Sequence, residues 1–140
     1  KLKRFDEYKE AIRRIQGHGI TVNACFVVGL DGHDTQVTDL IQYFVEEALS
    51  WNVQITLPTP FPGTPLYRQM QHEDRLIEQN AWEKCTLFDI NIKPKKLSVD
   101  ELRAGFYQLT QVLYGDAFTQ QRRGAFQQQW RSAWRMARAG

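Results

Sequence analysis

Residues 57–67 read LPTPFPGTPLY, and this proline-rich segment decides how the surrounding chain folds. Four of the five prolines of the chain lie within eight of these residues. Proline has no backbone N–H and fixes its own φ, so the apolar strand predicted over 53–57 must end here. Thr64 is a predicted N-cap and Pro65 takes the favoured first helical position. The segment therefore predicts a rigid loop between a strand and a helix.

Another strand is predicted upstream, over residues 20–30. Its sequence, ITVNACFVVGL, is a nearly continuous apolar run, which is typical of a parallel strand covered on both faces. A turn containing Gly29 and Gly32 then leads into a helix predicted over 35–50. Strand, helix and strand in this order form a βαβ unit of the α/β class. Its parallel strands would place the glycine turn and the proline-rich segment at one edge of the sheet.

Mainly helical segments surround this unit. Ser98 and Glu101 have the spacing of a capping box, which predicts the start of a helix. The elements predicted outside the βαβ unit are helices over 3–16, 64–72, 75–82, 98–114 and 119–138 and a short edge strand over 87–92. The fold class expected is therefore α/β, a βαβ slice followed by a mainly helical C-terminal region.

Composition and cysteine usage narrow the class of protein. The 140 residues can build one core, and no run of eighteen apolar residues predicts a transmembrane helix. Cys25 and Cys85 form neither a disulfide framework nor a metal motif, so a cytoplasmic location is the default expectation. Cys25 lies in the apolar strand, where a thiol is usually an inert core residue. The chain opens at Lys1 within an amphipathic pattern, which suggests a piece of a longer protein.

The distribution of charge raises an alternative function. Residues 1–116 carry 13 basic and 16 acidic side chains, whereas residues 117–140 carry five arginines and no acid. Arginines beside tryptophans suit a binding module for nucleic acid or an anionic surface. However, Phe126, Trp130 and Trp134 are spaced four apart, which favours a stripe that packs on the domain. The pattern therefore disfavours nucleic-acid binding.

No self-sufficient active site is visible in the sequence. Asp31, His33 and Asp34 could bind a divalent ion, but aspartates in turns more often cap helices. A hydrolase fragment of the TIM-barrel type is a minor alternative that lacks a carboxylate pair at a strand end. The edge formed by the glycine turn and the proline-rich segment could instead hold a flat group, such as a nucleobase, through backbone groups.

The two segments at this edge resemble a known family. Residues 26–35, FVVGLDGHDT, and then residues 57–67 resemble the last two βα units of a radical S-adenosylmethionine enzyme barrel. The later sequence Glu73-Asp74-Arg75-Leu76, with Trp82, Pro94 and Ser98-x-x-Glu101-Leu102, resembles the C-terminal region of the cobalamin-binding type, often labelled Fe-S oxidoreductases. The resemblance implies that residues 1–72 belong to a partial (β/α) TIM-like barrel and residues 73–140 to a mostly helical C-terminal domain.

The resemblance also implies the chemistry of the parent enzyme. In this family a four-iron four-sulfur cluster on a Cys-x3-Cys-x2-Cys loop reduces S-adenosylmethionine to a 5′-deoxyadenosyl radical, and this type adds a cobalamin. The chain has only Cys25 and Cys85 and so lacks the cluster motif. We therefore expect a fragment that is not catalytic alone and whose partner is the rest of the parent chain. Exposed sheet edges also make a homodimer an expectation.

The resemblance finally implies cofactor-binding residues. The family motif Gly-x-Ile-x-Gly-x-x-Glu, which lines the adenine site, falls on residues 25–32. Gly29 is kept and Val27 replaces the isoleucine, whereas Cys25 and Gly32 depart from the motif. Residues 57–59 resemble the segment whose backbone meets adenine. The residues expected at the adenine-side wall are Val27, Gly29, Leu57, Pro58 and Thr59, and no catalytic or metal-binding residue is expected.

Overall fold

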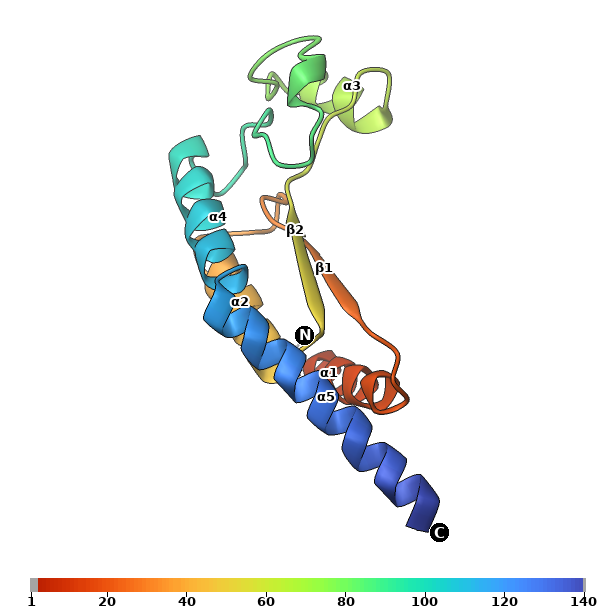
Figure 1. Cartoon of the computed structure of the whole chain (residues 1–140). Helices are drawn as coiled ribbons and strands as arrows, with labels where there is room; N and C mark the ends of the chain where they lie inside the picture. The colour runs from red at the N-terminus through yellow and green to blue at the C-terminus, as the bar shows by residue number, and fades with distance from the viewer. Residues whose placement is uncertain (1–2, 140) are drawn as a thin grey trace. The chain divides into compact units, whose positions relative to one another are not determined.

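The computed structural model describes residues 3–139, so Lys1, Leu2 and Gly140, which fall in the predicted segments 1–72 and 73–140, lie outside the described residues. The fold is mixed α/β (Figure 1). Its elements are α1 (Lys3–Gly17), β1 (Asn23–Val27), α2 (Val37–Ala48), β2 (Asn52–Thr56), α3 (Pro65–His72), the 3-10 turn η1 (Trp82–Lys84), α4 (Val99–Leu113) and α5 (Asp116–Ala139). None of these described helices is long and apolar enough to cross a membrane.

The sheet in the described residues consists of β1 and β2, which lie side by side. The Asn52 amide donates to the Val22 carbonyl at 3.0 Å, and at the other end the Val28 amide donates to the Thr56 carbonyl at 2.8 Å. The two strands are therefore parallel, joined by the α2 crossover, as the βαβ pattern predicts. A TIM-like barrel needs more strands than this pair.

The burial of β1 corrects the prediction of a strand covered on both faces. Its residues alternate between exposed and half-buried, with Asn23, Cys25 and Val27 on the exposed side. The apolar run led us to expect cover on both faces, but within residues 3–139 only one face of the strand pair is covered. Cys25 is therefore exposed, and the prediction that it is an inert core residue is wrong.

The described residues form two compact units. Among the described residues, the first comprises 3–25, 39–54 and 109–139, and the second comprises 26–38 and 55–108. Each strand contributes its N-terminal half to the first unit and its C-terminal half to the second. Each unit is built from separate segments of the chain. The division therefore does not test the boundary predicted at residue 72, which stays a prediction.

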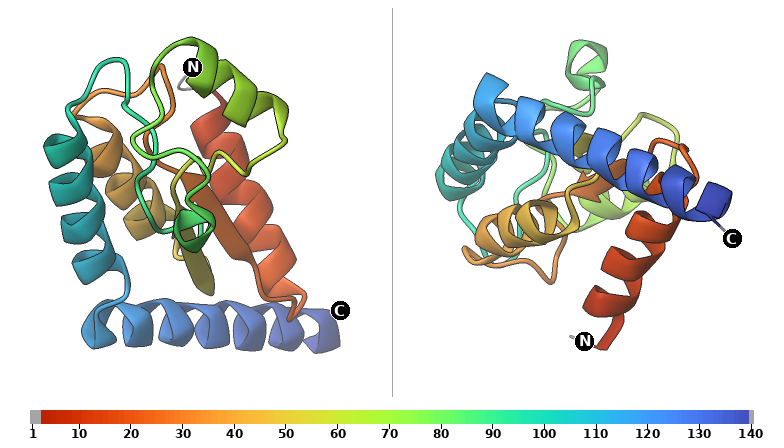
Figure 2. Two further views of the ribbon diagram at one scale, coloured as in Figure 1. Left: turned by 90° about the horizontal axis from the view of Figure 1, so that it is seen from above. Right: turned by 60° about the horizontal axis from the view of Figure 1, so that its bottom comes forward.

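In the first unit α1 packs against α5 (Figure 2). The β-carbon of Ala133 lies 3.7 Å from the place where a Cβ on Gly17 would stand, and the Trp130 indole nitrogen lies 2.9 Å from that place on Gly19. Gly19 has φ +79°, the left-handed conformation expected after the end of α1. These small residues let the end of α1 approach α5 closely.

The predicted apolar stripe of α5 is only partly buried. Phe126 is buried and its ring meets that of Trp51 edge-on, with centroids 4.9 Å apart. Trp130 and Trp134 are about half exposed, and the Arg138 guanidinium lies 3.9 Å from the Trp134 ring centroid. The stripe therefore faces the core at Phe126, and the prediction is wrong for Trp134.

In the second unit a small core forms where the sequence predicted a weak helix. Tyr67 and Met70 of α3 pack with Leu76 and Ile92, which form an isolated antiparallel bridge. The predicted helix over 75–82 and strand over 87–92 are therefore wrong, apart from this bridge and the turn η1. Left-handed φ values occur at Asp74 (+52°), directly before the predicted helix, and at Asn80 (+55°), within it. A continuous helix over 75–82 therefore cannot form.

The helix starts of this unit are predicted correctly. The Thr64 hydroxyl accepts a hydrogen bond from the Tyr67 amide at 3.2 Å, and Pro65 begins α3. The Ser98 hydroxyl accepts from the Glu101 amide at 3.1 Å, while the Glu101 carboxylate accepts from the Ser98 amide at 2.7 Å. This reciprocal pair is the capping box of α4.

Candidate functional site

The glycine turn and the proline-rich segment both follow the same end of the sheet in the second unit. The last hydrogen bond of the strand pair joins Val28 to Thr56, directly before the two segments. The Pro58 Cδ atom lies 3.6 Å from the position that a Cβ on Gly29 would take. The carboxyl ends of the two parallel strands are thus adjacent, which is where α/β folds commonly place ligands.

The residues expected at the adenine-side wall differ in their access to solvent. Val27 is 42% exposed, whereas Leu57 and Thr59 are buried at 3% and 8% exposed. Pro58 is half-buried and Gly29 is buried. Val27 therefore offers a side chain for contact with a ligand, whereas Leu57 and Thr59 offer mainly their positions in the backbone.

Hydrogen bonds fix the backbone of this wall. The Leu57 amide donates to the Leu87 carbonyl at 2.7 Å, and the Thr59 hydroxyl donates to the Leu57 carbonyl at 3.3 Å. The Phe61 amide donates to the Thr59 carbonyl at 3.0 Å. Because the Leu57 N–H is already donated, the groups left for contact with a ligand here are the exposed Val27 side chain and the remaining backbone groups.

Gly29 has a packing role that its sequence motif does not reveal. Its φ is +95°, and an added Cβ would lie 2.9 Å from Cδ2 of Leu102 on α4. The glycine therefore lets the first turn of α4 pack onto the end of β1. This contact fixes the helical region against the edge of the sheet within the second unit.

The described residues do not fit an iron-sulfur cluster. Cys25 is exposed and Cys85 half-buried, and both are free thiols. No group of three or more histidine, cysteine, aspartate or glutamate side chains within residues 3–139 could hold a metal ion. His33 of the candidate metal turn instead accepts a hydrogen bond from the Leu30 amide at 3.3 Å. The cysteines of residues 3–139 therefore do not match the three-cysteine ligand set of such a cluster.

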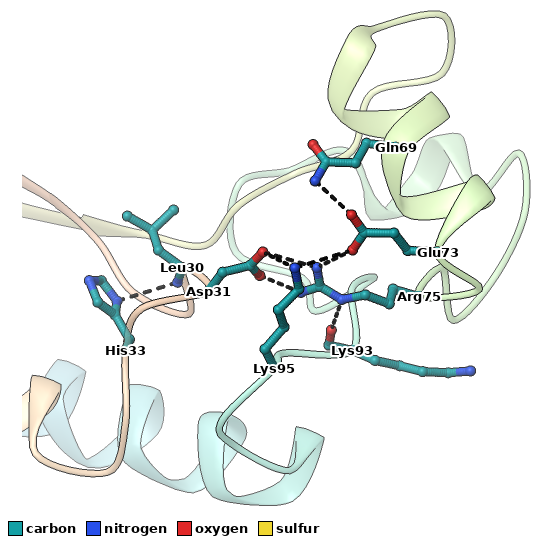
Figure 3. Close-up of polar contacts among 8 residues, drawn as sticks. All are labelled: Leu30, Asp31, His33, Gln69, Glu73, Arg75, Lys93 and Lys95. Carbon is teal, nitrogen blue, oxygen red and sulfur yellow. Dashed lines mark hydrogen bonds and ion pairs between the residues drawn. The ribbon is translucent and has the colours of Figure 1, made fainter.

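A charged cluster anchors the glycine turn (Figure 3). The Arg75 guanidinium binds both carboxylate oxygens of Asp31, at 2.5 and 3.2 Å, and Glu73 at 2.8 Å. Arg75 Nε also donates to the Lys93 carbonyl at 2.8 Å, and Lys95 Nζ lies 3.1 Å from Asp31. The Arg75 side chain is 11% exposed, so these bonds are largely shielded from water. The cluster ties the loop after β1 to the segment after α3.

The charged cluster makes stability depend on acid pH. The Arg75 guanidinium lowers the pKa of Asp31 and, with Gln69, that of Glu73. Because each folded pKa is depressed, the stabilisation is complete above about pH 4.5 and is lost as pH falls through the lowered values. We expect urea unfolding to show a drop in stability as the pH falls below about 4.

The variant Asp31→Asn tests the origin of this drop. It should lower stability at pH 7 and flatten the acid-side decrease, because one of the two depressed carboxylates is gone. Asp100→Asn is the matched control, since Asp100 is exposed and forms an ion pair with Arg103 three residues along α4. An unchanged pH profile in Asp31→Asn would contradict the assignment.

Sequence reasoning missed the charged cluster. The sequence pattern offers Asp31 as a metal ligand or a cap, and Arg75 enters only through the resemblance. The partners are 44 residues apart. The available signal is the presence of Glu73, Arg75, Lys93 and Lys95 after the glycine turn, but no local rule pairs these charges with Asp31.

Comparisons with known proteins identify a family model and several related proteins. The family described as a domain of unknown function, DUF4070, matches residues 64–139. The bacteriochlorophyllide d C-12(1)-methyltransferase of Chlorobaculum tepidum is 25% identical over 122 residues, which is 86% of this chain and 26% of that protein. The hopanoid C-2 methylase of Rhodopseudomonas palustris is 30% identical over 74 residues, 53% of this chain and 14% of that protein.

A third relative is the anaerobic magnesium-protoporphyrin IX monomethyl ester cyclase of Cereibacter sphaeroides. It is 28% identical over 102 residues, which cover 71% of this chain and 16% of that protein. The chain thus spans about a quarter or less of the length of these relatives.

Proposed function

This chain belongs to the DUF4070 family and is related to radical S-adenosylmethionine enzymes of the cobalamin-binding type, and from this premise we propose that it is the C-terminal part of such an enzyme. It forms the last two βα units of the catalytic barrel, over residues 1–72, and a mostly helical cap, over residues 73–140. The adjacent ends of the two parallel strands are the observation that carries the proposal.

Within the parent enzyme the chain contributes the adenine-side wall of the S-adenosylmethionine site. Val27 contacts the ring with its exposed side chain, while Pro58 and Thr59 present the rigid backbone after β2. Gly29 sets the distance between this wall and the cap through Leu102. When bound, S-adenosylmethionine supplies radical chemistry, with the iron-sulfur cluster held by another part of the parent.

Two relatives are named as a methyltransferase and a methylase and the third as a cyclase, so the reaction of the parent is either transfer of a methyl group or closure of a ring. The rest of the parent chain is the principal partner. Pairing of sheet edges between two copies stays a prediction, which light scattering of the purified chain tests.

The test of the proposed function uses the full-length protein that contains this chain, reconstituted anaerobically with iron and sulfide. Its sequence should contain a Cys-x3-Cys-x2-Cys motif, and the reduced protein should convert S-adenosylmethionine to 5′-deoxyadenosine. A full-length protein without the motif and without this product would overturn the proposal.

The variant Val27→Lys tests the adenine-side wall in the full-length protein. An ammonium at this exposed strand end would repel the sulfonium of S-adenosylmethionine and hinder ring contact, so we expect binding to weaken about tenfold. Leu40→Lys is the matched control, because Leu40 is an exposed aliphatic residue on α2 and is not one of the residues expected at the adenine-side wall. Equal affinity of both variants in equilibrium dialysis would remove Val27 from the site.

A further inference from the structure

A cavity of about 500 Å³ lies in the second unit beside the end of β2. Its lining is largely apolar and includes Leu57, Ile77, Phe88, Val99 and Phe106. Phe88 and Ile77 are 55% and 42% exposed, so large apolar surfaces face the cavity mouth or solvent. The volume is in the usual range for small-molecule sites, roughly 300–1,000 Å³.

The loop that presents Phe88 is held in a strained conformation. Leu87 has φ +69°, which an aliphatic residue rarely adopts. The Leu87 carbonyl accepts the Leu57 amide at 2.7 Å, and the Phe88 amide donates to the Thr86 hydroxyl at 3.1 Å. Strain of this kind persists only where surrounding bonds impose it, and it often accompanies ligand sites. The loop is thus fastened to a residue of the adenine-side wall.

The charges around the cavity are mostly cationic, and they differ in how well they are neutralised. Lys84 forms a short ion pair with Glu78, and Arg103 lies 2.7 Å from Asp100. The lining carboxylate of Asp89 accepts the Thr86 hydroxyl at 2.6 Å. Lys93 Nζ, by contrast, donates to the Asp74 backbone carbonyl at 3.2 Å and lies 4.0 Å from the fully exposed carboxylate of Asp74. The Lys93 ammonium is therefore the lining cation with the weakest ion pair.

We propose that this cavity binds the substrate of the parent enzyme, and that this substrate is an amphipathic anion with an apolar, ring-containing body and a carboxylate. Phe88, Ile77 and Phe106 contact the apolar body, and Lys93 binds the carboxylate. The assignment as substrate site rests on the proposed function, because Leu57 joins the cavity lining to the adenine-side wall.

The experiment titrates the 140-residue chain with pyrenebutyrate, a fluorescent carboxylate with an apolar ring body, and with its uncharged methyl ester. The acid should bind more tightly than the ester. Lys93→Gln should weaken binding of the acid about fivefold and leave the ester unchanged, because only the acid uses the ammonium. Phe88→Ala should weaken both about tenfold through lost ring contact.

Matched control variants distinguish binding in the cavity from non-specific binding of the probe. Lys96→Gln removes an equal charge outside the lining, and Tyr8→Ala removes an equally exposed aromatic, 55%, from α1. Both controls should bind the probes like the wild type. Phe88 and Lys93 are exposed, so their variants should fold, and circular dichroism checks this. Equal losses in variants and controls, or equal binding of acid and ester, would overturn the proposal.

The full-length protein separates this inference from the proposed function. Pyrenebutyrate should still bind there, and Phe88→Ala and Lys93→Gln should leave the affinity for S-adenosylmethionine unchanged. If the full-length protein binds S-adenosylmethionine but not the probe, other parts of the parent cover the cavity and the inference fails alone. If it binds the probe but neither binds nor cleaves S-adenosylmethionine, the proposed function fails and with it the assignment as substrate site.

Discussion

Replacing Gly29 with alanine should lower the free energy of unfolding by about 2–3 kcal/mol. Two costs combine at this position. A side chain at φ +95° is strained by about 1–2 kcal/mol, and the new Cβ would stand 2.9 and 3.2 Å from the two methyl carbons of Leu102. Leu102 is 4% exposed, so it has little room to move aside. Urea unfolding of wild type and variant measures the effect.

Alanine variants of two other glycines distinguish the cost of backbone strain from the cost of the contact with Leu102. Gly63 has φ +86° but no atom within 4 Å of an added Cβ, so Gly63→Ala should show the strain alone, about 1–2 kcal/mol. Gly32 has open space and lies outside the left-handed region, so Gly32→Ala should change stability by less than about 0.5 kcal/mol. Equal losses at Gly29 and Gly63 would mean that the Leu102 contact contributes nothing.

A double-variant cycle isolates the contact itself. Leu102→Ala is destabilising because it leaves a cavity. It also removes the methyl carbons that an alanine at 29 would meet, so Gly29→Ala should cost less in that background than in the wild type. The difference between the two costs is the coupling between the strand end and α4. A coupling of zero would place α4 away from Gly29.

Arg122→Ala should lower the free energy of unfolding by about 3 kcal/mol, whereas Arg122→Met should be at least as stable as the wild type. Arg122 of α5 is 1% exposed, and its Nη2 donates to the Leu113 carbonyl at 2.9 Å and to the Thr119 hydroxyl at 3.2 Å. Its Nε and Nη1 are buried without a hydrogen-bond partner. Burial lowers the pKa of this guanidinium.

The two substitutions at Arg122 differ in the volume that they leave, so comparing their free energies of unfolding separates the effect of volume from that of charge. Alanine removes both the charge and the volume, so the space beside the end of α4 is left empty. Methionine keeps most of the volume and relieves the desolvated charge, although the Leu113 carbonyl loses its donor. Thermal and urea unfolding of both variants, with Arg123→Met as the exposed control, measures the contrast. A Met variant clearly less stable than the wild type would show that the hydrogen bonds to Leu113 and Thr119 outweigh the cost of burying the charge.

Several features of the fold could be predicted from short sequence motifs, because neighbouring residues determine where these elements begin and end. The proline-rich segment predicted the end of β2, and the Thr64 and Ser98 caps predicted the starts of α3 and α4. The βαβ pattern predicted the parallel pairing. In each case the energy that fixes the element comes from groups within a few residues, so the sequence displays it directly.

Features that depend on distant partners were not predictable in this way. The segment after His72 has helical composition, yet it extends so that Leu76 can bridge to Ile92. Asp31 finds Arg75 across 44 residues, and Arg122 is buried although arginine is ordinarily a surface residue. The exposure of one side of β1 could not be predicted either, because an apolar run does not determine how many neighbouring elements cover the strand.

The reactivity of the exposed Cys25 thiol can report whether the open face of the strand pair is covered by other parts of a longer protein. Cys25 is exposed on the strand pair, whereas Cys85 is half-buried. A maleimide dye should therefore label position 25 rapidly in the 140-residue chain. If the remaining strands of a barrel cover that face in the full-length protein, labelling there should slow by orders of magnitude. Peptide mapping of the label in the 140-residue chain and in the full-length protein would then show whether this face of the sheet is covered. The measurement needs no cofactor, substrate or turnover.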